Sequence, residues 1–195
     1  LIRSLDRTIA KSPSGIIHGE VSLKGRGPKF GALSGQGEVK VSRGRLYDFP
    51  LLMSVFSVLN LKMPRKSSVT DAYGEFDIEQ GQFDIKNALF FGGSVPAHLQ
   101  GTISFDAPGT LEEKPIDLLF TIAKEEGVLD KIPLLNWAKH YTVDYLRGII
   151  FQAKVKGKLG DYKVQTLSSP IMGPIKNMFS LVEKYTPSPP KINPQ

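Results

Sequence analysis

One short phrase recurs along the chain: a glycine, a stretch in which polar and apolar residues alternate, and a second glycine. It reads GEVSLKG at 19–25, GEVKVSRG at 37–44, GEFDIEQG at 74–81 and GTISFDAPG at 101–109. Alternation with a period of two is typical of a β-strand that buries one face. Such strands cannot bury their apolar faces singly, so we expect them to lie side by side in one antiparallel sheet.

The alternation extends beyond the four copies of the phrase. Strands are predicted within 14–25, 33–44, 69–81, 81–93, 94–109, 115–125 and 148–169, the last as a hairpin that turns at Gly160–Asp161. Within 81–93 the pattern places Phe83, Ile85, Leu89 and Phe91 on one face. The chain is therefore expected to be mainly β.

Two or three short helices are expected to interrupt the strands. A helix near 50–60 begins at Pro50, a second region near 128–146 is broken at Pro133, and an amphipathic helix covers 171–184. The last helix either packs over the end of the sheet, or plugs the apolar trough or touches the outer membrane. We expect a leading segment at 1–14, one domain at 15–185 and a disordered, proline-rich tail at 186–195.

Glycines recur on the apolar faces of the predicted strands, two positions before an aliphatic or aromatic residue. They are Gly19, Gly37, Gly74, Gly101 and Gly157. Glycine weakens a strand interior, but it relieves crowding on the concave side of a bent sheet. The repeated glycines therefore favour a curved sheet that forms an apolar groove, although they also fit bulges or strand starts.

If the sheet is bent in this way, its concave side is lined by apolar side chains. The predicted lining is Val39, Val41, Phe76, Ile78, Phe83, Ile85, Leu99, Ile103, Phe105, Leu118, Phe120, Phe151 and Val155. Small-molecule enzymes place a few converging polar groups in such a site, and this set contains none. An apolar trough suits hydrocarbon chains, so we expect a lipid-binding protein that is not an enzyme.

The amino-acid composition constrains the fold and function less than the strand pattern does. The chain has 25 Lys and Arg against 19 Asp and Glu, a net charge of +6, and no cysteine. The basic residues are scattered, which is typical of a solvated surface, and no nucleic-acid partner is expected. The sequence starts at Leu1 with neither a signal peptide nor a run of 18 apolar residues, so we expect a piece of a longer protein.

Motifs that would indicate catalysis, a metal or a cofactor are missing from the sequence. His18, His98 and His140 are far apart and lack a second ligand at metal-binding spacing, so surface positions are expected for all three. No phosphate-binding loop or nucleophile motif occurs. The lysines at 154, 156 and 158 share the polar face of one strand. They suit an edge strand that resists aggregation, or contacts with phosphate groups.

Three segments resemble the C-terminal region of AsmA-like proteins. They are LSGQGEVKVSRGRLYDFPLLMSVFSVLNL, AYGEFDIEQGQFDIKNALFFGGSVPAHLQGTISF and FQAKVKGKLGDYKV, and the resemblance spans about residues 15–170. The family has an aspartate-proline turn before its last strand, whereas Asp161 is followed here by Tyr162. The resemblance implies a β-taco-like groove and no catalytic residues.

The resemblance also implies a cellular role. AsmA-like proteins are related to TamB and, more distantly, to bridge-like lipid transfer proteins. They are anchored in the bacterial inner membrane by an N-terminal helix, and they project into the periplasm. The resemblance therefore implies that this chain is the distal part of such a protein, without its anchor. The family is implicated in phospholipid transport to the outer membrane and in envelope integrity.

Two other functions stay open. The first is a structural scaffold, or a protein-interaction module in outer-membrane assembly, that contacts envelope proteins through an exposed strand edge. The second is a carbohydrate-binding or hydrolytic β-domain, for which Tyr73, Glu75 and Asp77 provide a faint aromatic and acidic cluster.

Overall fold

The chain forms one antiparallel sheet of eight strands, each paired with its neighbours in the sequence. A computed structural model describes residues 15–26, 30–44, 50–61, 70–91, 96–123 and 150–185. The strands are β1 (Ile16–Gly25), β2 (Leu33–Gly44), β3 (Thr70–Glu79), β4 (Gln82–Phe91), β5 (Ala97–Ser104), β6 (Pro115–Ala123), β7 (Ile150–Lys158) and β8 (Asp161–Thr166).

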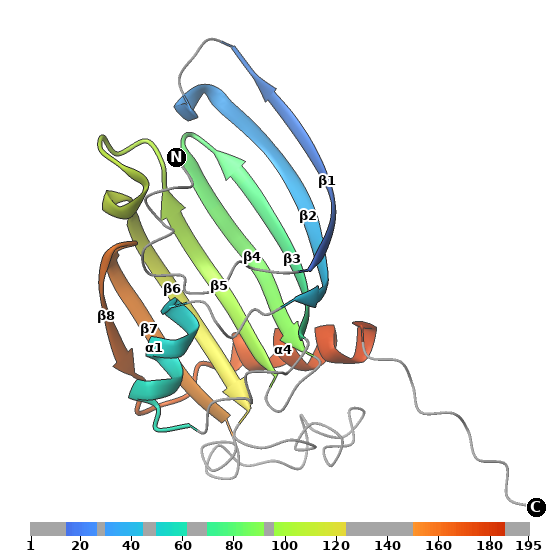
Figure 1. The fold of residues 1–195 in the computed structure, drawn as a ribbon, viewed down its shortest axis with the longest axis vertical. Coiled ribbons are helices and arrows are strands. Elements are labelled where there is room, and N and C mark those ends of the chain that lie inside the picture. Colours follow the sequence, from blue (N-terminus) through green and yellow to red (C-terminus); the bar gives the residue numbers. More distant parts are fainter. Residues whose placement is uncertain are drawn as a thin grey trace, which may run out of the picture.

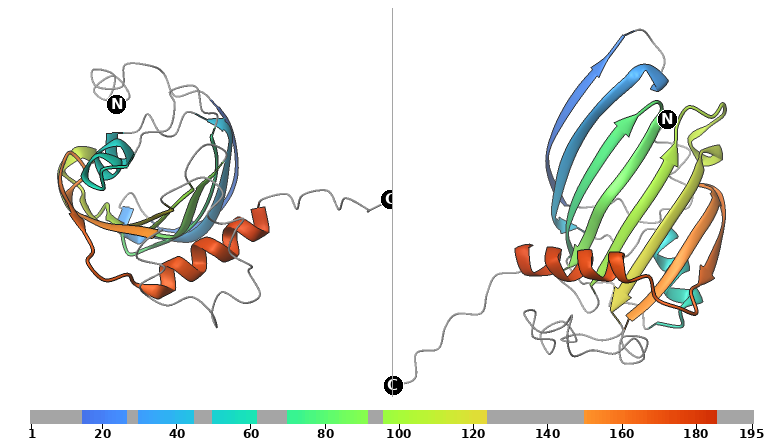
Figure 2. Two further views of the ribbon diagram at one scale, coloured as in Figure 1. Left: turned by 90° about the horizontal axis from the view of Figure 1, so that it is seen from below. Right: turned by 180° about the vertical axis from the view of Figure 1, so that it is seen from behind.

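The sheet is curved and does not close on itself. Seen end-on, the strands follow an arc from β8 to β1 (Figure 2, left). The expectation of a mainly β, curved antiparallel sheet with short helices is therefore confirmed. Two single 3-10 turns, Phe30–Ala32 and Leu111–Glu113, precede β2 and β6.

Two helices lie on opposite sides of the sheet among the described residues. Helix α1 (Pro50–Val58) lies within the curve, and helix α4 (Met172–Tyr185) crosses its outer side (Figures 1 and 2). The predicted helical region near 128–146, the leading segment 1–14 and the tail 186–195 lie outside the described residues.

Helix α1 forms the first core with the concave side of β5, β6 and β7. Val55 and Phe56 are fully buried, and they pack in one cluster with Leu118, Phe120 and Val155. The helix is also tied to the edge strand β8, where Ser54 Oγ lies 3.1 Å from the hydroxyl of Tyr162. The proline-opened apolar helix thus fills one half of the curve.

Helix α4 forms a second core on the convex side of the sheet. Ile175, Met178 and Phe179 are buried in a cluster that also contains Leu89 and Tyr73. The alternative in which this helix plugs the apolar, concave side is therefore wrong. An amphipathic pattern shows which helix face is buried, but it does not show which side of a sheet receives that face.

The position of α4 also changes the environment of the polar face beneath it. His98, Thr121 and Gln152 belong to that face, and they are 0%, 0% and 3% exposed. The expectation of a surface position is wrong for His98, whereas His18 is exposed as expected. His140 lies outside the described residues.

A bulge in β4 changes which residues share a face. Between Ile85 and Ala88 the strand carries one residue more than β5, and opposite Glu75 and Phe76 it carries one more than β3. The extra residue shifts the alternation by one position. Leu89 therefore lies opposite His98 and packs under α4, so its predicted place on the face of Ile85 is wrong.

Candidate functional site: the concave face of the sheet

The strand register brings the predicted lining residues onto the concave face. Across β2, β3, β4 and β5, one row runs from Val39 through Gly74 and Ala88 to Leu99. It continues to Phe120 on β6 and to Ala153 on β7. Twelve of the thirteen predicted residues follow the parity of such rows, so the alternation in the sequence sets the face on which they lie. The thirteenth, Phe105, follows the end of β5 and contacts Phe83.

Four of these residues are covered by α1. Leu99, Leu118, Phe120 and Val155 are at most 8% exposed and belong to the core cluster of that helix. Three others, Ile85, Ile103 and Phe151, are half-buried against the same cluster. This half of the concave face is hydrophobic core and holds the fold together.

The other half of the concave face, on β1 to β4, remains accessible. Val39, Val41 and Phe76 are half-buried there. On the edge strand β1 the exposure is greater: Ile17 is 71% exposed, Val21 55% and Leu23 50%. The β1 side chains were not among the predicted lining residues, although the same alternation places them on this face. We call these six residues the open apolar strip.

Aromatic rings extend the open apolar strip from Phe76 on β3 to Phe83 on β4 and Phe105 just beyond β5. The rings of Phe76 and Phe83 are stacked with centroids 4.5 Å apart, and Phe83 meets Phe105 edge-on at 6.3 Å. Ile78 lies opposite Phe83 and is only 7% exposed. Offset and edge-on aromatic pairs of this kind fix ring positions, so the three phenylalanine rings form an ordered apolar surface.

The glycines of β1 to β3 sit where a side chain would meet a neighbour on the concave face. A Cβ on Gly37 would stand 2.6 Å from Cζ of Phe76, and one on Gly19 would stand 2.9 Å from the carbonyl oxygen of Glu38. At Gly74 the nearest atom would be a methyl group of Val39 at 3.1 Å. These approaches are the crowding that a bent sheet imposes on its inner side.

Gly101 and Gly157 are required for a different reason, which is their backbone conformation. Their φ angles are +134° and +136°, a region that favours glycine. An added Cβ would also stand 2.2 Å from the Asp117 carbonyl oxygen at Gly101, and 2.5 Å from that of Asp161 at Gly157. At these two positions both conformation and space require glycine.

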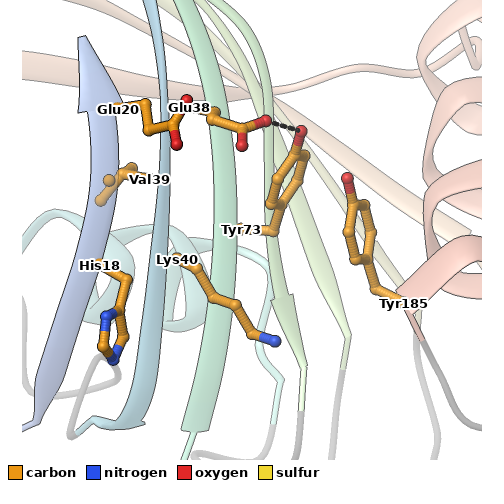
Figure 3. A pocket seen from close by; sticks show the side chains of 8 residues that line it. His18, Glu20, Glu38, Val39, Lys40, Tyr73 and Tyr185 are labelled. Atoms are coloured by element: carbon orange, nitrogen blue, oxygen red, sulfur yellow. Dashed lines mark hydrogen bonds between the residues drawn. The ribbon is translucent and has the colours of Figure 1, made fainter.

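The convex face near the same edge is polar and hollowed. One hollow of about 460 Å³ is lined by the side chains of His18, Glu20, Glu38, Lys40, Tyr73 and Tyr185, with Gly19 and Val39 (Figure 3). A second hollow of about 610 Å³ adjoins it and includes Glu75, Asp77 and Lys86 in its lining. The two faces of β1 and β2 thus differ sharply in chemistry.

Tyr73 organises the polar groups of this hollow. Its hydroxyl contacts a carboxylate oxygen of both Glu38, at 3.3 Å, and Glu75. Burial, together with the hydrogen bond to Glu75, raises the pKa of Tyr73 well above its usual value, so the phenol stays protonated. The same hydrogen bond lowers the pKa of Glu75. The arrangement holds a phenol between two carboxylates and supplies no activated nucleophile.

The aromatic rings of the hollow are already engaged. The rings of Tyr73 and Tyr185 are stacked at 4.0 Å, and Tyr73 is only 6% exposed. Carbohydrate recognition uses exposed ring faces. The structure therefore gives little support to a carbohydrate site at Tyr73, Glu75 and Asp77, because the ring of Tyr73 is not free to stack on a sugar.

Two of the three lysines at 154, 156 and 158 are paired within the sheet. Lys154 and Lys156 lie 3.5 and 2.9 Å from the carboxylate of Asp117 on β6. Their strand β7 lies between β6 and β8, so the interpretation of these residues as edge lysines is wrong. Exposed ion pairs of this kind contribute little to stability.

The part of the chain that the structure describes offers no metal site and no membrane-spanning helix. Among the described residues, no group of three or more His, Cys, Asp or Glu side chains is placed to hold a metal ion, and no helix has the length and hydropathy to span a membrane. Compared with known proteins, the chain matches no family model, no curated protein and no solved structure.

Proposed function

We propose that this chain is a lipid-binding domain of the AsmA-like type, which holds acyl chains on the concave face of its sheet and catalyses no reaction. The observation that carries the proposal is the open apolar strip, above all Ile17, Val21 and Leu23, which are 50 to 71% exposed. Contiguous exposed apolar surface of this kind is typical of a binding site on a soluble domain.

The proposed mechanism is partition between water and an apolar surface. Each methylene group removed from water contributes about 0.8 kcal/mol. Binding of that kind is non-directional, so an acyl chain is held without being fixed at one position along the strands. The headgroup stays in water, because the concave face presents no matching polar group among the predicted lining residues.

The cellular role that we propose is transport of phospholipid through the periplasm in support of outer-membrane integrity, within a parent protein anchored in the inner membrane. Only the resemblance of the sequence to AsmA-like proteins supports this role. The resemblance suggests the periplasm as the compartment and phospholipid as the cargo. The proposal that the chain binds lipid depends on the concave face alone.

The test is native mass spectrometry of the purified chain, which detects bound phospholipid as a mass increment. Ile17→Asp places a charge on the concave face and should remove the lipid. Ile16→Asp is a matched control, because this neighbouring isoleucine is also exposed, at 48%, but lies on the other face of β1. Lipid retained equally by both variants, or absent from the unmodified protein, would contradict the proposal.

A second candidate is the protein-interaction module, which the exposed edge strand β1 favours. All ten residues of β1 are exposed. Photo-crosslinking groups placed at Phe76 or Phe105 distinguish the two candidates. Lipid adducts support the lipid-binding domain, and protein adducts support the interaction module.

A further inference from the structure

The two edges of the sheet are built differently. Strand β8 has six residues, and its Tyr162 and Val164 pack against the core cluster of α1. Strand β1 has ten residues, pairs with β2 through ten positions without a register shift, and contains no proline. Natural proteins usually blunt a long regular edge strand, because it is a template for pairing with another strand. Strand β1 is therefore long, regular and free of proline, and its charged side chains, Glu20 and Lys24, are the features that decide which strand it can pair with.

Charges on the convex side of β1 are unbalanced in a way that a further strand would correct. Glu20 lies directly opposite Glu38, and Glu38 lies directly opposite Glu75, which makes a row of three carboxylates. The inner two share the hydroxyl of Tyr73. Like charges that face each other across strands are destabilising. Glu20 ends this row at the open edge, where a cation on an added strand would be favourable.

Strand β1 carries that cation itself, four residues along the same face, at Lys24. We propose that β1 pairs antiparallel with the β1 of a second copy of this chain, with Ser22 opposite Ser22 of the second copy on the two-fold axis. In this register each Glu20 lies opposite a Lys24, and each Val21 lies opposite a Leu23. The inference is independent of the proposed lipid binding, since it depends on the strand edge and its charges.

The same charges disfavour three of the four neighbouring registers, and the fourth, centred on Leu23, sets Glu20 opposite Arg26, which lies beyond the end of β1. A shift that centres the pair on Glu20 brings two carboxylates together, and one that centres it on Lys24 brings two ammonium groups together. Centring on Val21 pairs Glu20 with Ser22 and leaves both charges unmatched. Because the two-fold axis stands perpendicular to the sheet, the apolar faces of both copies lie on the same side. The open apolar strips then become continuous, and Val21 and Leu23 cover one another.

Charge reversal tests the pairing in solution. Sedimentation velocity of the full chain over a range of concentrations should show a monomer–dimer equilibrium that weakens at high salt. Glu20→Lys and Lys24→Glu should each weaken the dimer about tenfold, because two cross-strand pairs become repulsive in each variant. The double variant should restore the affinity. Circular dichroism checks that these exposed substitutions leave the fold intact.

Disulfide trapping tests the register. The chain has no cysteine, so Ser22→Cys introduces a single thiol. Directly opposite Cα atoms in an antiparallel pair are about 4.5 to 5.5 Å apart, within the range that a disulfide spans. Oxidation with diamide should give a covalent dimer of this variant. The control is Gln36→Cys, which lies opposite Ser22 on β2, one strand in from the edge, and should stay monomeric.

The results of the two experiments distinguish pairing through β1 from other modes of association. A dimer that responds to charge reversal and is trapped at Ser22 supports the pairing. A chain that stays monomeric at all concentrations, a dimer indifferent to both single reversals, or equal trapping at Ser22 and Gln36 would overturn it. A dimer that forms without bound lipid leaves the inference standing even if the proposed function fails.

Discussion

The ring of Phe76 on β3 lies over Gly37 on β2, so that a Cβ added to the glycine would stand 2.6 Å from Cζ of the ring. The two residues are direct partners in the register of the sheet. The ring of Phe76 thus occupies the space on the concave face that a side chain at position 37 would take, and it covers the backbone of Gly37. The first prediction follows from this contact.

Gly37→Ala should lower the free energy of unfolding by about 1 to 3 kcal/mol, because the ring must leave its place against Phe83. Gly173→Ala is the contrasting variant, since an added Cβ there meets nothing within 4 Å in the first turn of α4. It should raise the free energy of unfolding by up to about 1 kcal/mol through helix propensity. Urea denaturation measures both. Equal effects of the two substitutions would contradict the crowding at Gly37.

Gly101 should tolerate alanine less well than Gly37 does. Its φ of +134° is unfavourable for any other residue, and the atom that a Cβ would meet, at 2.2 Å, is a backbone carbonyl oxygen. A ring can turn aside, but a backbone in a paired strand cannot without loss of its hydrogen bonds. We expect Gly101→Ala to cost about 3 kcal/mol or more in the same denaturation experiment. A cost below that of Gly37→Ala would show that β5 adjusts freely at this point.

The sequence predicts these faces well where the alternation is regular. In β5, Leu99, Gly101 and Ile103 fall on the concave side as predicted, because period two sets the face of each residue once the strand is formed. Leu89 breaks the rule because a bulge adds one residue to β4. No residue type in that segment marks the bulge, so the shift appears only when three strands are aligned.

The positions of the helices are harder to predict than their presence. The helix near 50–60 and the helix at 171–184 are both present as α1 and α4. Their sequences do not specify opposite sides of the sheet. That placement decides that Leu118 and Phe120 are core residues under α1, and it buries His98 under α4. Docking depends on contacts between distant segments, and a periodic pattern reports only local structure.

Helix α1 gives the third prediction, which separates core from open surface. Phe56 is fully buried between the helix and the sheet, whereas Met53 on the same helix is 47% exposed. Phe56→Ala should cost about 3 to 5 kcal/mol, because it removes a ring from a packed cluster. Met53→Ala should change stability by less than about 0.5 kcal/mol. Thermal unfolding followed by circular dichroism compares them, and similar losses would contradict the packing of α1 inside the curve.

The fourth prediction concerns acid stability and His98. Burial lowers the pKa of this histidine from 6.5 to about 4, and its Nε2 lies 3.1 Å from Asn87 Oδ1. Between these two pKa values the unfolded chain binds a proton that the folded chain does not. The contribution to stability is therefore fully present above pH 6.5 and is lost as the pH falls towards 4. It amounts to about 3 kcal/mol.

His98→Gln should flatten that pH dependence. Urea midpoints measured from pH 7 to pH 4.5 test this, and this interval avoids most of the titration of Glu75, whose pKa is lowered from 4.5. Leu89→Ala is the control, since it weakens the same region beneath α4 without removing a titrating group. Parallel curves for His98→Gln and the unmodified protein would show that His98 is not the group responsible.

Gln152 gives the last prediction, because it connects β7 to the start of α4. Its side-chain carbonyl accepts a hydrogen bond from the backbone N–H of Ile171 at 2.6 Å, and its amide donates to the Ile171 carbonyl and to Thr121 Oγ1, each at 3.0 Å. Gln152→Ala leaves the buried Thr121 hydroxyl and the partly buried backbone groups of Ile171 without their partner, and should cost about 1 to 3 kcal/mol. Amide exchange should increase along α4 and stay unchanged along α1, since the two helices lie on opposite sides of the sheet. Gln165→Ala on the exposed part of β8 should leave both helices as they were. Exchange that rises equally in α1 and α4 would mean that the helices do not dock independently.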